Sequence, residues 1–154
     1  MTTRTIFEQE LTSLRDDLKR MCFLVEGVYE KLFSAMQIGD RSTILDISEQ
    51  DHQVRDMEKQ IESRCLSLLT RQQPLARDLR MVSASLKVVT DIRRVGDHVV
   101  DMAELILRMD GKDFGAYSKH LDEMVKETKE MFHDSVSAFL KRSKDEAQRV
   151  IDTD

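Results

Sequence analysis

Three carboxylates within the sequence TDIRRVGDHVVDMAE, residues 90–104, have a spacing that could hold a cation. Asp97, Asp101 and Glu104 are separated by four and three residues, so on a helix their side chains stack along one face. Like charges stacked in this way repel each other unless something positive lies between them. Carboxylate oxygens are the ligands that hard metal ions prefer. The three residues are therefore candidate metal ligands.

Two further acids, Asp51 and Glu58, interrupt an apolar helical pattern. They are seven residues apart and share one helix face, which should point into a bundle. A buried carboxylate without a partner is costly, so both need partners. If their helix packs antiparallel to the next one, Asp51 comes close to the Asp97–Glu104 strip. The sequence thus predicts a carboxylate metal site that draws ligands from two helices: Asp51, Glu58, Asp97, Asp101 and Glu104.

Neighbouring arginines offer a simpler reading of the same acids. Arg93 and Arg94 precede Asp97 by four and three residues, and Arg108 follows Glu104 by four. Such pairs would make an ordinary salt-bridged, solvated helix face, each pair contributing little. His52 and His98 each adjoin an acid, so each is either a further ligand or an exposed helical histidine.

Gly96 stands where the helical pattern calls for an apolar residue. Glycine costs about 1 kcal/mol in a helix interior, so we expect it to allow close approach by a neighbouring backbone or side chain.

Other kinds of chemistry find little support in the sequence. It contains no Ser/His/Asp or Cys/His arrangement at a useful spacing and no Gly-rich phosphate loop. The segment RQQPLARDLR places Arg71, Arg77 and Arg80 around a helix start, which is either an anion-docking point or a capping region with solvent-facing arginines.

These residues must be positioned by long helices. Apolar residues recur in steps of four and three over about 7–37, 42–69, 74–109 and 114–141, and charged residues of both signs make up 34% of the chain. Gly39 is expected to end the first helix and Pro74 to begin the third. The predicted fold is all-α: an antiparallel three-helix bundle over residues 1–110, followed over 113–154 by the first helix of a second, incomplete bundle.

An internal repeat supports this organisation. With an offset of 103 residues, FSAMQIGDRSTILDISEQD (33–51) aligns without gaps on VSAFLKRSKDEAQRVIDTD (136–154). We expect the fourth helix to cover its apolar face either by folding back on the first bundle or by packing against a second copy, so a homodimer is one predicted state.

Charge and hydropathy limit the class of protein and the cellular location that the sequence allows. A net charge of −5 argues against a nucleic-acid-binding domain. No run of 18 apolar residues and no signal peptide occur, so we expect a cytoplasmic protein that reaches a membrane only through partners. Cys22 and Cys65 fall within helical patterns and are expected to be buried, unpaired thiols.

The chain resembles the PhoU family, regulators of bacterial phosphate uptake. The resemblance runs from FEQELTSLRDDL to DIRRVGDHVVDMAE, and RQQPLARDLR is its other specific segment. It implies two three-helix bundles, each with an acidic motif that binds metal ions in some members. Asp97-x-x-x-Asp101 fits that motif, and the ion would be divalent or ferric (Fe, Zn, Mn or Mg). Arg93, however, stands where the family usually has Glu, which favours a single ion or none.

The resemblance also implies a non-catalytic role. It points to a negative regulator of phosphate uptake and starvation signalling that contacts the ATPase subunit of a phosphate ABC transporter and a sensor histidine kinase. Two other classes remain open at this stage. One is a metal-binding helical bundle of the di-iron type, which requires a Glu-x-x-His pair on each of two helices. The other is a structural coiled-coil adaptor.

Overall fold

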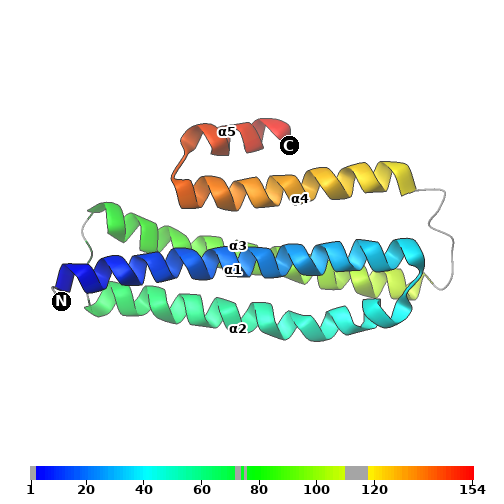
Figure 1. The fold of residues 1–154 in the computed structure, drawn as a ribbon, viewed down its shortest axis with the longest axis horizontal. Helices are drawn as coiled ribbons and strands as arrows, with labels where there is room; N and C mark the ends of the chain where they lie inside the picture. The colour runs from blue at the N-terminus through cyan, green and yellow to red at the C-terminus, as the bar shows by residue number, and fades with distance from the viewer. Residues whose placement is uncertain (1–2, 72–73, 75, 110–117) are drawn as a thin grey trace. The chain divides into compact units, whose positions relative to one another are not determined.

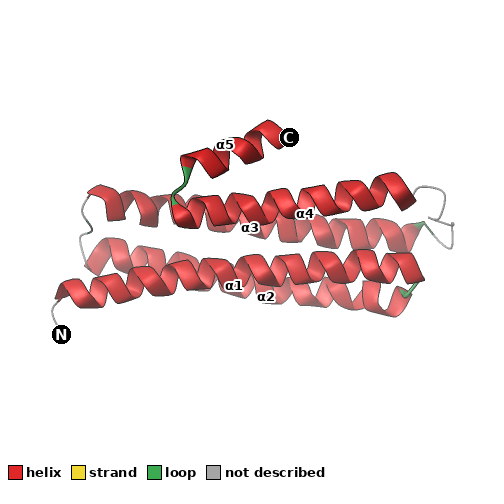
Figure 2. Cartoon of the chain, turned by 45° about the horizontal axis from the view of Figure 1, so that its top comes forward, coloured by secondary structure: helices red, strands yellow, loops and turns green. Residues whose placement is uncertain are grey.

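A computed structural model describes residues 3–71, 74, 76–109 and 118–154, without the side chains of Thr3 and 48–51. Within these ranges the chain forms helices joined by short loops, and no strand occurs in them (Figure 2). The helices, in chain order (Figure 1), are α1 (Thr3–Ile38), α2 (Arg41–Arg71), α3 (Ala76–Arg108), α4 (Ser118–Lys141) and α5 (Lys144–Thr153). The predicted all-α fold is confirmed.

The chain divides into two compact units that cut across the helices. Unit 1 comprises residues 1–25 and 50–98, and unit 2 comprises residues 26–49 and 99–154. The first three helices therefore contribute a segment to each unit, and α4 and α5 belong to unit 2. The predicted division into 1–110 and 113–154 concerns sequence repeats, whereas the two units are groups of residues that pack together. That division stays a prediction.

In unit 1, segments of α1, α2 and α3 pack together, and each runs antiparallel to the one before it in the chain. Arg64, late in α2, contacts Glu10 and Asp17, early in α1. Within α2 and α3, Arg93 contacts Glu58 while the later Gly96 faces the earlier Val54. The core is the apolar pattern read from the sequence, and its members are buried: Leu14, Leu18, Met21, Val54, Ile61, Cys65, Leu68, Val82, Val89 and Ile92. Both cysteines are buried, as predicted, and neither forms a disulfide within the described residues.

In unit 2, the last part of α3 packs between the end of α1 and the start of α2. Their side chains form one apolar cluster of Val28, Leu32, Ala35, Ile44, Ile47, Val99 and Ala103. α4 then folds back along α1, which is one of the two outcomes expected for the fourth helix. Four polar contacts mark the antiparallel pairing, namely Gln37–Asp122, Tyr29–Val125, Glu30–Lys129 and Glu26–His133.

The turn between α1 and α2 follows the expected capping chemistry. Gly39 has φ +70°, a conformation that favours glycine. The amide of Asp40 donates to the carbonyl of Ala35 at 2.9 Å. The Asp40 carboxylate then accepts from the backbone amide of Thr43 at 3.1 Å, which caps α2.

The turn between α4 and α5 repeats this geometry 103 residues later. Arg142 has φ +57° in the place of Gly39. The amide of Ser143 donates to the carbonyl of Ala138 at 2.9 Å, and the Ser143 hydroxyl accepts from the amide of Glu146 at 3.2 Å. Each bond has its counterpart at the first turn, so the internal repeat seen in the sequence is also present in the backbone.

The helix boundaries differ from prediction in a few places. α1 begins four residues earlier than expected and α3 two residues later. The predicted start of the fourth helix at 114 lies outside the described residues. The larger difference is at the end of the chain, where the sequence predicted one helix after residue 113 and the structure also has α5. The Ser143 cap and the acids Asp145 and Glu146 in the first turn explain why this ten-residue segment is helical.

Candidate functional site

The acidic residues singled out in the sequence meet an arginine within unit 1. The Nε of Arg93 on α3 lies 3.1 Å from the carboxylate of Glu58 on α2. The same guanidinium contacts the carboxylate of Asp97, one turn further along α3. The side chains of Arg93, Asp97 and Glu58 are 26%, 30% and 15% exposed, so the three groups are largely withdrawn from water. One planar cation thus neutralises acids from two helices.

A second arginine approaches the other oxygen of Asp97. The guanidinium of Arg55, on α2, lies 3.8 Å from Asp97 Oδ1. That oxygen is buried and has no hydrogen-bond partner in the part of the chain that the structure describes. The contact with Arg55 is therefore electrostatic, and each oxygen of Asp97 has a guanidinium beside it.

The pKa values of these groups reflect burial and charge acting together. Burial raises the pKa of Glu58 above its ordinary value, and the charge of Arg93 opposes this rise only in part. Burial alone would lower the pKa of Arg93, but the charges of Asp97 and Glu58 and the hydrogen bonds to them raise it. The guanidinium is therefore a fixed cation at physiological pH, and burial disfavours the charged form of Glu58.

Gly96 lies beside this group and explains part of the helix contact. A Cβ at this position would lie 3.4 Å from Cγ1 of Val54 on α2 and 3.6 Å from Cγ2 of Val25 on α1. The expected close approach is confirmed, and it is made by side chains of two other helices. These distances are ordinary van der Waals contact, so a methyl group fits and a longer side chain would not.

Two of the remaining predicted metal ligands, Asp101 and Glu104, are not part of this group. Asp101 and Glu104 are exposed and belong to the segment of α3 in unit 2, where Glu104 pairs with Arg108 at 3.4 Å. The side chain of Asp51 lies outside the described residues. Among the residues that are described, no group of three or more His, Cys, Asp or Glu side chains could hold a metal ion.

Metal binding at the five acids stays a prediction. For Glu58 and Asp97 the donor chemistry does not fit an added ion, because Arg93 already lies between the two carboxylates and is permanently charged. The salt-bridged reading holds for Arg93–Asp97 and Arg108–Glu104, whereas Arg94 pairs with Asp91.

The other basic and histidine candidates are solvent-facing. Arg71, Arg77 and Arg80 are exposed, as are His52 and His98. Nothing in the described residues gathers the three arginines into an anion-binding pocket.

Sequence reasoning missed a polar contact between α1 and α4 in unit 2. The Nδ1 of His133 lies 2.7 Å from the carboxylate of Glu26, a residue only 8% exposed. Lys129 contacts Glu30 one turn away. No local signal pointed to this pair: Glu130-x-x-His133 and Glu49-x-x-His52 have the Glu-x-x-His spacing of di-iron bundles, which indicates a metal site and not a contact with Glu26. In the structure His133 instead pairs with Glu26, and the side chain of Glu49 is outside the described residues.

The family assignment comes from comparison with known proteins. The sequence profile described as "PhoU domain" matches residues 18–106, more than half of the chain. The chain belongs to the PhoU family. Within it, this PhoU-family chain is 35% identical over 153 residues to the "phosphate-specific transport system accessory protein PhoU homolog" of Clostridium acetobutylicum, covering 99% of the chain and 70% of the relative. The predicted resemblance is confirmed.

Two further relatives of this PhoU-family chain carry related descriptions. A "phosphate-specific transport system accessory protein PhoU homolog" of Synechocystis is 35% identical over 106 residues, which cover 69% of the chain and 47% of the relative. The "phosphate-specific transport system accessory protein PhoU" of Escherichia coli is 28% identical over 144 residues, covering 94% of the chain and 60% of the relative. The chain thus spans about half to two thirds of the length of several curated relatives. None of its described helices is long and apolar enough to cross a membrane.

Proposed function

We propose that this chain is an accessory protein of a phosphate transport system that acts by protein contact and not by catalysis. The observation that carries the proposal is membership of the PhoU family, together with relatives at 28–35% identity described as phosphate-specific transport system accessory proteins. The finer role we propose is a negative regulator of phosphate uptake and of the starvation response. Its proposed place is the cytoplasm.

Two partners follow from the family resemblance: the ATPase subunit of a phosphate ABC transporter and a sensor histidine kinase. The charged groups of unit 1 support a binding role in preference to a chemical one. Arg93, Glu58 and Asp97 neutralise one another across two helices, and Arg64 does the same with Glu10 and Asp17. Such groups fix the helices as rigid surfaces, and rigid helices with polar faces suit recognition of other proteins.

A co-purification experiment tests the proposal. The tagged full chain is mixed with the transporter ATPase and, separately, with the cytoplasmic part of the kinase from the same genome. We expect retention of at least one partner that survives washing at moderate salt. An ATPase subunit from an unrelated ABC transporter serves as the matched control. Failure to retain either cognate partner, or equal retention of the unrelated subunit, would contradict the proposal.

The regulatory direction needs a cellular measurement. Deleting the gene in its host should raise expression of a phosphate-starvation reporter in phosphate-replete medium, and expressing the chain should restore repression. Unchanged reporter expression would contradict negative regulation. It would not bear on binding to the ATPase or the kinase, which the co-purification experiment tests.

A further inference from the structure

The outer face of α3 in unit 1 carries a row of basic side chains. Arg80, Lys87 and Arg94 follow one another at intervals of seven residues, about two helical turns, so their side chains lie along one face over about 21 Å. All three are exposed, and so is Arg77, one turn before Arg80. We call these four residues the α3 basic row.

Most of this row has no acidic neighbour. Within the residues that the structure describes, Arg77, Arg80 and Lys87 form no ion pair. Arg94 pairs with Asp91 at 3.5 Å, and both of these side chains are open to solvent. Three of the four bases are therefore free to meet an anion from another molecule.

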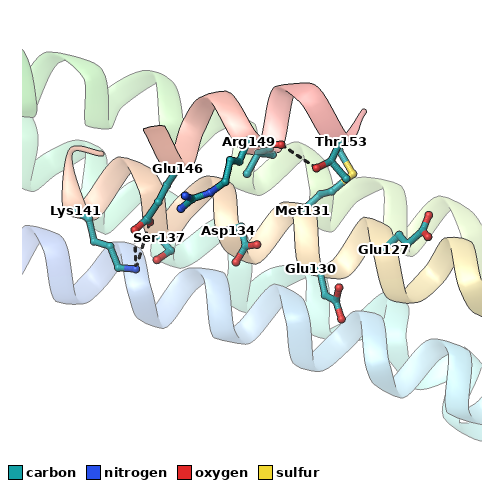
Figure 3. Close-up of a pocket in the computed structure, with 10 residues that line it drawn as sticks. Glu127, Glu130, Met131, Asp134, Ser137, Lys141, Glu146, Arg149 and Thr153 are labelled. Carbon is teal, nitrogen blue, oxygen red and sulfur yellow. Dashed lines mark hydrogen bonds and ion pairs between the residues drawn. The ribbon is translucent and has the colours of Figure 1, made fainter. Parts of the chain in front are cut away.

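Exposed bases elsewhere in the chain lie beside an acid. In unit 2, Lys141 of α4 pairs with Glu146 of α5 at 3.2 Å (Figure 3). Arg108, at the end of α3, pairs with Glu104 one turn earlier at 3.4 Å. Pairs of this kind cancel the local charge, which the first half of α3 leaves uncompensated.

The row makes this face basic on an acidic protein. Four bases and one acid, Asp91, give the face a net charge of +3, whereas the whole chain carries −5. Asp78 is the other acid between residues 76 and 94, but it lies two residues before Arg80 and nine before Lys87, on the opposite side of the helix. A local positive field of this kind attracts an acidic ligand.

Helix stability does not account for the row. Arg77 is in the first turn of α3, at the positive end of the helix dipole, where a base is unfavourable. Arg77 and Arg80 are also neighbours on the helix surface and repel each other. A binding role accounts for bases at positions where they do not stabilise the helix.

We propose that the α3 basic row binds an acidic helix of a partner protein, which lies along α3 with its own acids at seven-residue spacing. Two helices have the same rise per residue, so such acids meet Arg80, Lys87 and Arg94 in turn. Charge pairs between adjacent helices set partner choice and orientation. This inference deepens the proposed function by naming a surface and the chemistry of its partner, and it rests on that function for the partner's existence.

The residues between the bases favour a protein over a lipid surface. Ser83 is exposed and Ala84 is half-buried, and both are small enough for a neighbouring helix to approach closely. Residues 81–93 are all described, and none of them exposes a large apolar side chain that could enter a membrane. The net charge of −5 also opposes binding to an anionic membrane.

A synthetic helix tests the inference with the full chain. The probe is a peptide of about 25 residues, long enough to be helical in water, with three glutamates at seven-residue spacing and alanine and glutamine elsewhere. Heteronuclear NMR at low salt should show saturable shifts of the amides of residues 77–94, and the affinity should fall as salt rises. A peptide of the same composition with its glutamates spread around the helix should bind at least about threefold more weakly.

Two charge reversals locate the binding surface. Lys87 is exposed at the centre of the row, so Lys87→Glu should weaken binding by at least about tenfold. Lys59→Glu is the matched control, because Lys59 is an exposed lysine of α2 in unit 1 that forms no ion pair within the described residues. It changes the net charge equally and should alter the affinity by less than about twofold. Far-UV circular dichroism checks that both variants keep their helices.

Three results would overturn the assignment of the row. The first is the absence of saturable shifts in α3, or equal losses in Lys87→Glu and Lys59→Glu. The second is sedimentation with phosphatidylserine vesicles that Lys87→Glu abolishes, because lipid headgroups would then be the occupant. The third is a dimer in light scattering that Lys87→Glu dissociates, because a second copy would then cover the row.

The co-purification experiment separates this inference from the proposed function. Retention of the transporter ATPase or the kinase that Lys87→Glu reduces would uphold the row, and retention that this variant leaves unchanged would overturn it. Peptide binding without retention of either protein would uphold the row and count against the proposed partners.

Discussion

The guanidinium of Arg93 contacts one carboxylate on α2 and one on α3, and so holds Glu58 and Asp97 together in unit 1. The sequence alone places Arg93 and Asp97 one turn apart, so their pairing could be predicted. It does not fix the register between α2 and α3, which is what brings Glu58 to the same guanidinium. The sequence alone therefore leaves a shared metal ion as an alternative to this salt bridge.

Arg93→Met should lower the free energy of unfolding at pH 7 by about 1–2 kcal/mol, since Glu58 then loses the guanidinium beside it and Asp97 keeps only the more distant Arg55, at 3.8 Å. The loss is smaller than for a fully buried pair because solvent screens the group in part. Arg94→Met is the matched control: Arg94 pairs with Asp91 on the exposed surface, so its loss should stay below about 0.5 kcal/mol. Urea unfolding measures both, and equal losses would contradict the bridging role.

The same variant should show a defined pH dependence. Burial raises the pKa of Glu58, and removing Arg93 removes the charge that opposes this rise. Stability that depends on protonated Glu58 is fully present below the unfolded pKa and is lost as pH rises through the folded pKa. The penalty of Arg93→Met should therefore be larger at pH 7 than at pH 4, and a penalty that grows on acidification would count against this account.

Gly96 allows a prediction with opposite signs for two substitutions. Gly96→Ala places a methyl group in ordinary contact with Val54 and Val25 and improves helix propensity, so stability should rise by up to about 1 kcal/mol. Gly96→Leu overfills the same space and should cost about 1–3 kcal/mol. Urea unfolding of the pair decides, and a destabilised alanine variant would mean that the helices cannot accommodate even one carbon.

Cys65 links burial to alkaline stability. Burial, with a smaller contribution from Glu62, raises the pKa of the Cys65 thiol to about 11. The stability this proton confers is fully present below the unfolded pKa near 9 and is lost as pH rises through 11. Between pH 8 and pH 11, the free energy of unfolding should fall more steeply for the wild type than for Cys65→Ala. Parallel curves would show that the thiol does not contribute.

At the scale of elements, the α1–α2 turn and the α4–α5 turn have the same backbone hydrogen bonds but different residues. Gly39 adopts φ +70° at the first turn, and Arg142 adopts φ +57° at the second. Helix periodicity, the Gly39 stop and the offset of 103 residues were all readable from the sequence. The α5 helix was not, because a ten-residue segment carries too few apolar positions for its period to stand out, and its helicity depends on the Ser143 cap.

Exchanging the turn residues should move stability in opposite directions. Arg142→Gly relieves a left-handed conformation that non-glycine residues adopt at a cost, so unit 2 should gain about 0.5–1 kcal/mol. Gly39→Ala should lose about 1 kcal/mol for the same reason. Hydrogen exchange of the amides of α4 and α5 reports the first change, and slower exchange is the expected result. Faster exchange in Arg142→Gly would indicate that the arginine side chain, and not the backbone, determines the turn.

At the scale of the whole molecule, the first three helices contribute segments to both compact units, and α4 and α5 belong to unit 2. The apolar pattern predicted this core well, because every long helix carries its own stripe. Contacts such as Glu26–His133 could not be predicted, because they depend on which helix α4 folds against. That choice is made by long-range packing and leaves no local pattern.

Metal removal tests the five-acid prediction on the intact protein. Because Arg93 already neutralises Glu58 and Asp97, we expect dialysis against a chelator to leave the thermal midpoint unchanged. A tightly bound ion would instead have stabilised the native state, and its removal would lower the midpoint. Elemental analysis of the purified chain and of Asp97→Ala completes the test: stoichiometric metal that disappears in the variant would establish the ion.

The burial of both native cysteines has a practical consequence. A new cysteine at an exposed position, such as Leu45 in α2 or Leu66 further along the same helix, would be the accessible thiol for a nitroxide label at neutral pH. Doubly labelled chains could then be prepared in the native background, without first removing core residues. With the second label on another helix, such as at Met124 in α4, pulsed dipolar spectroscopy would report the spacing between the helices in solution, with and without a binding partner.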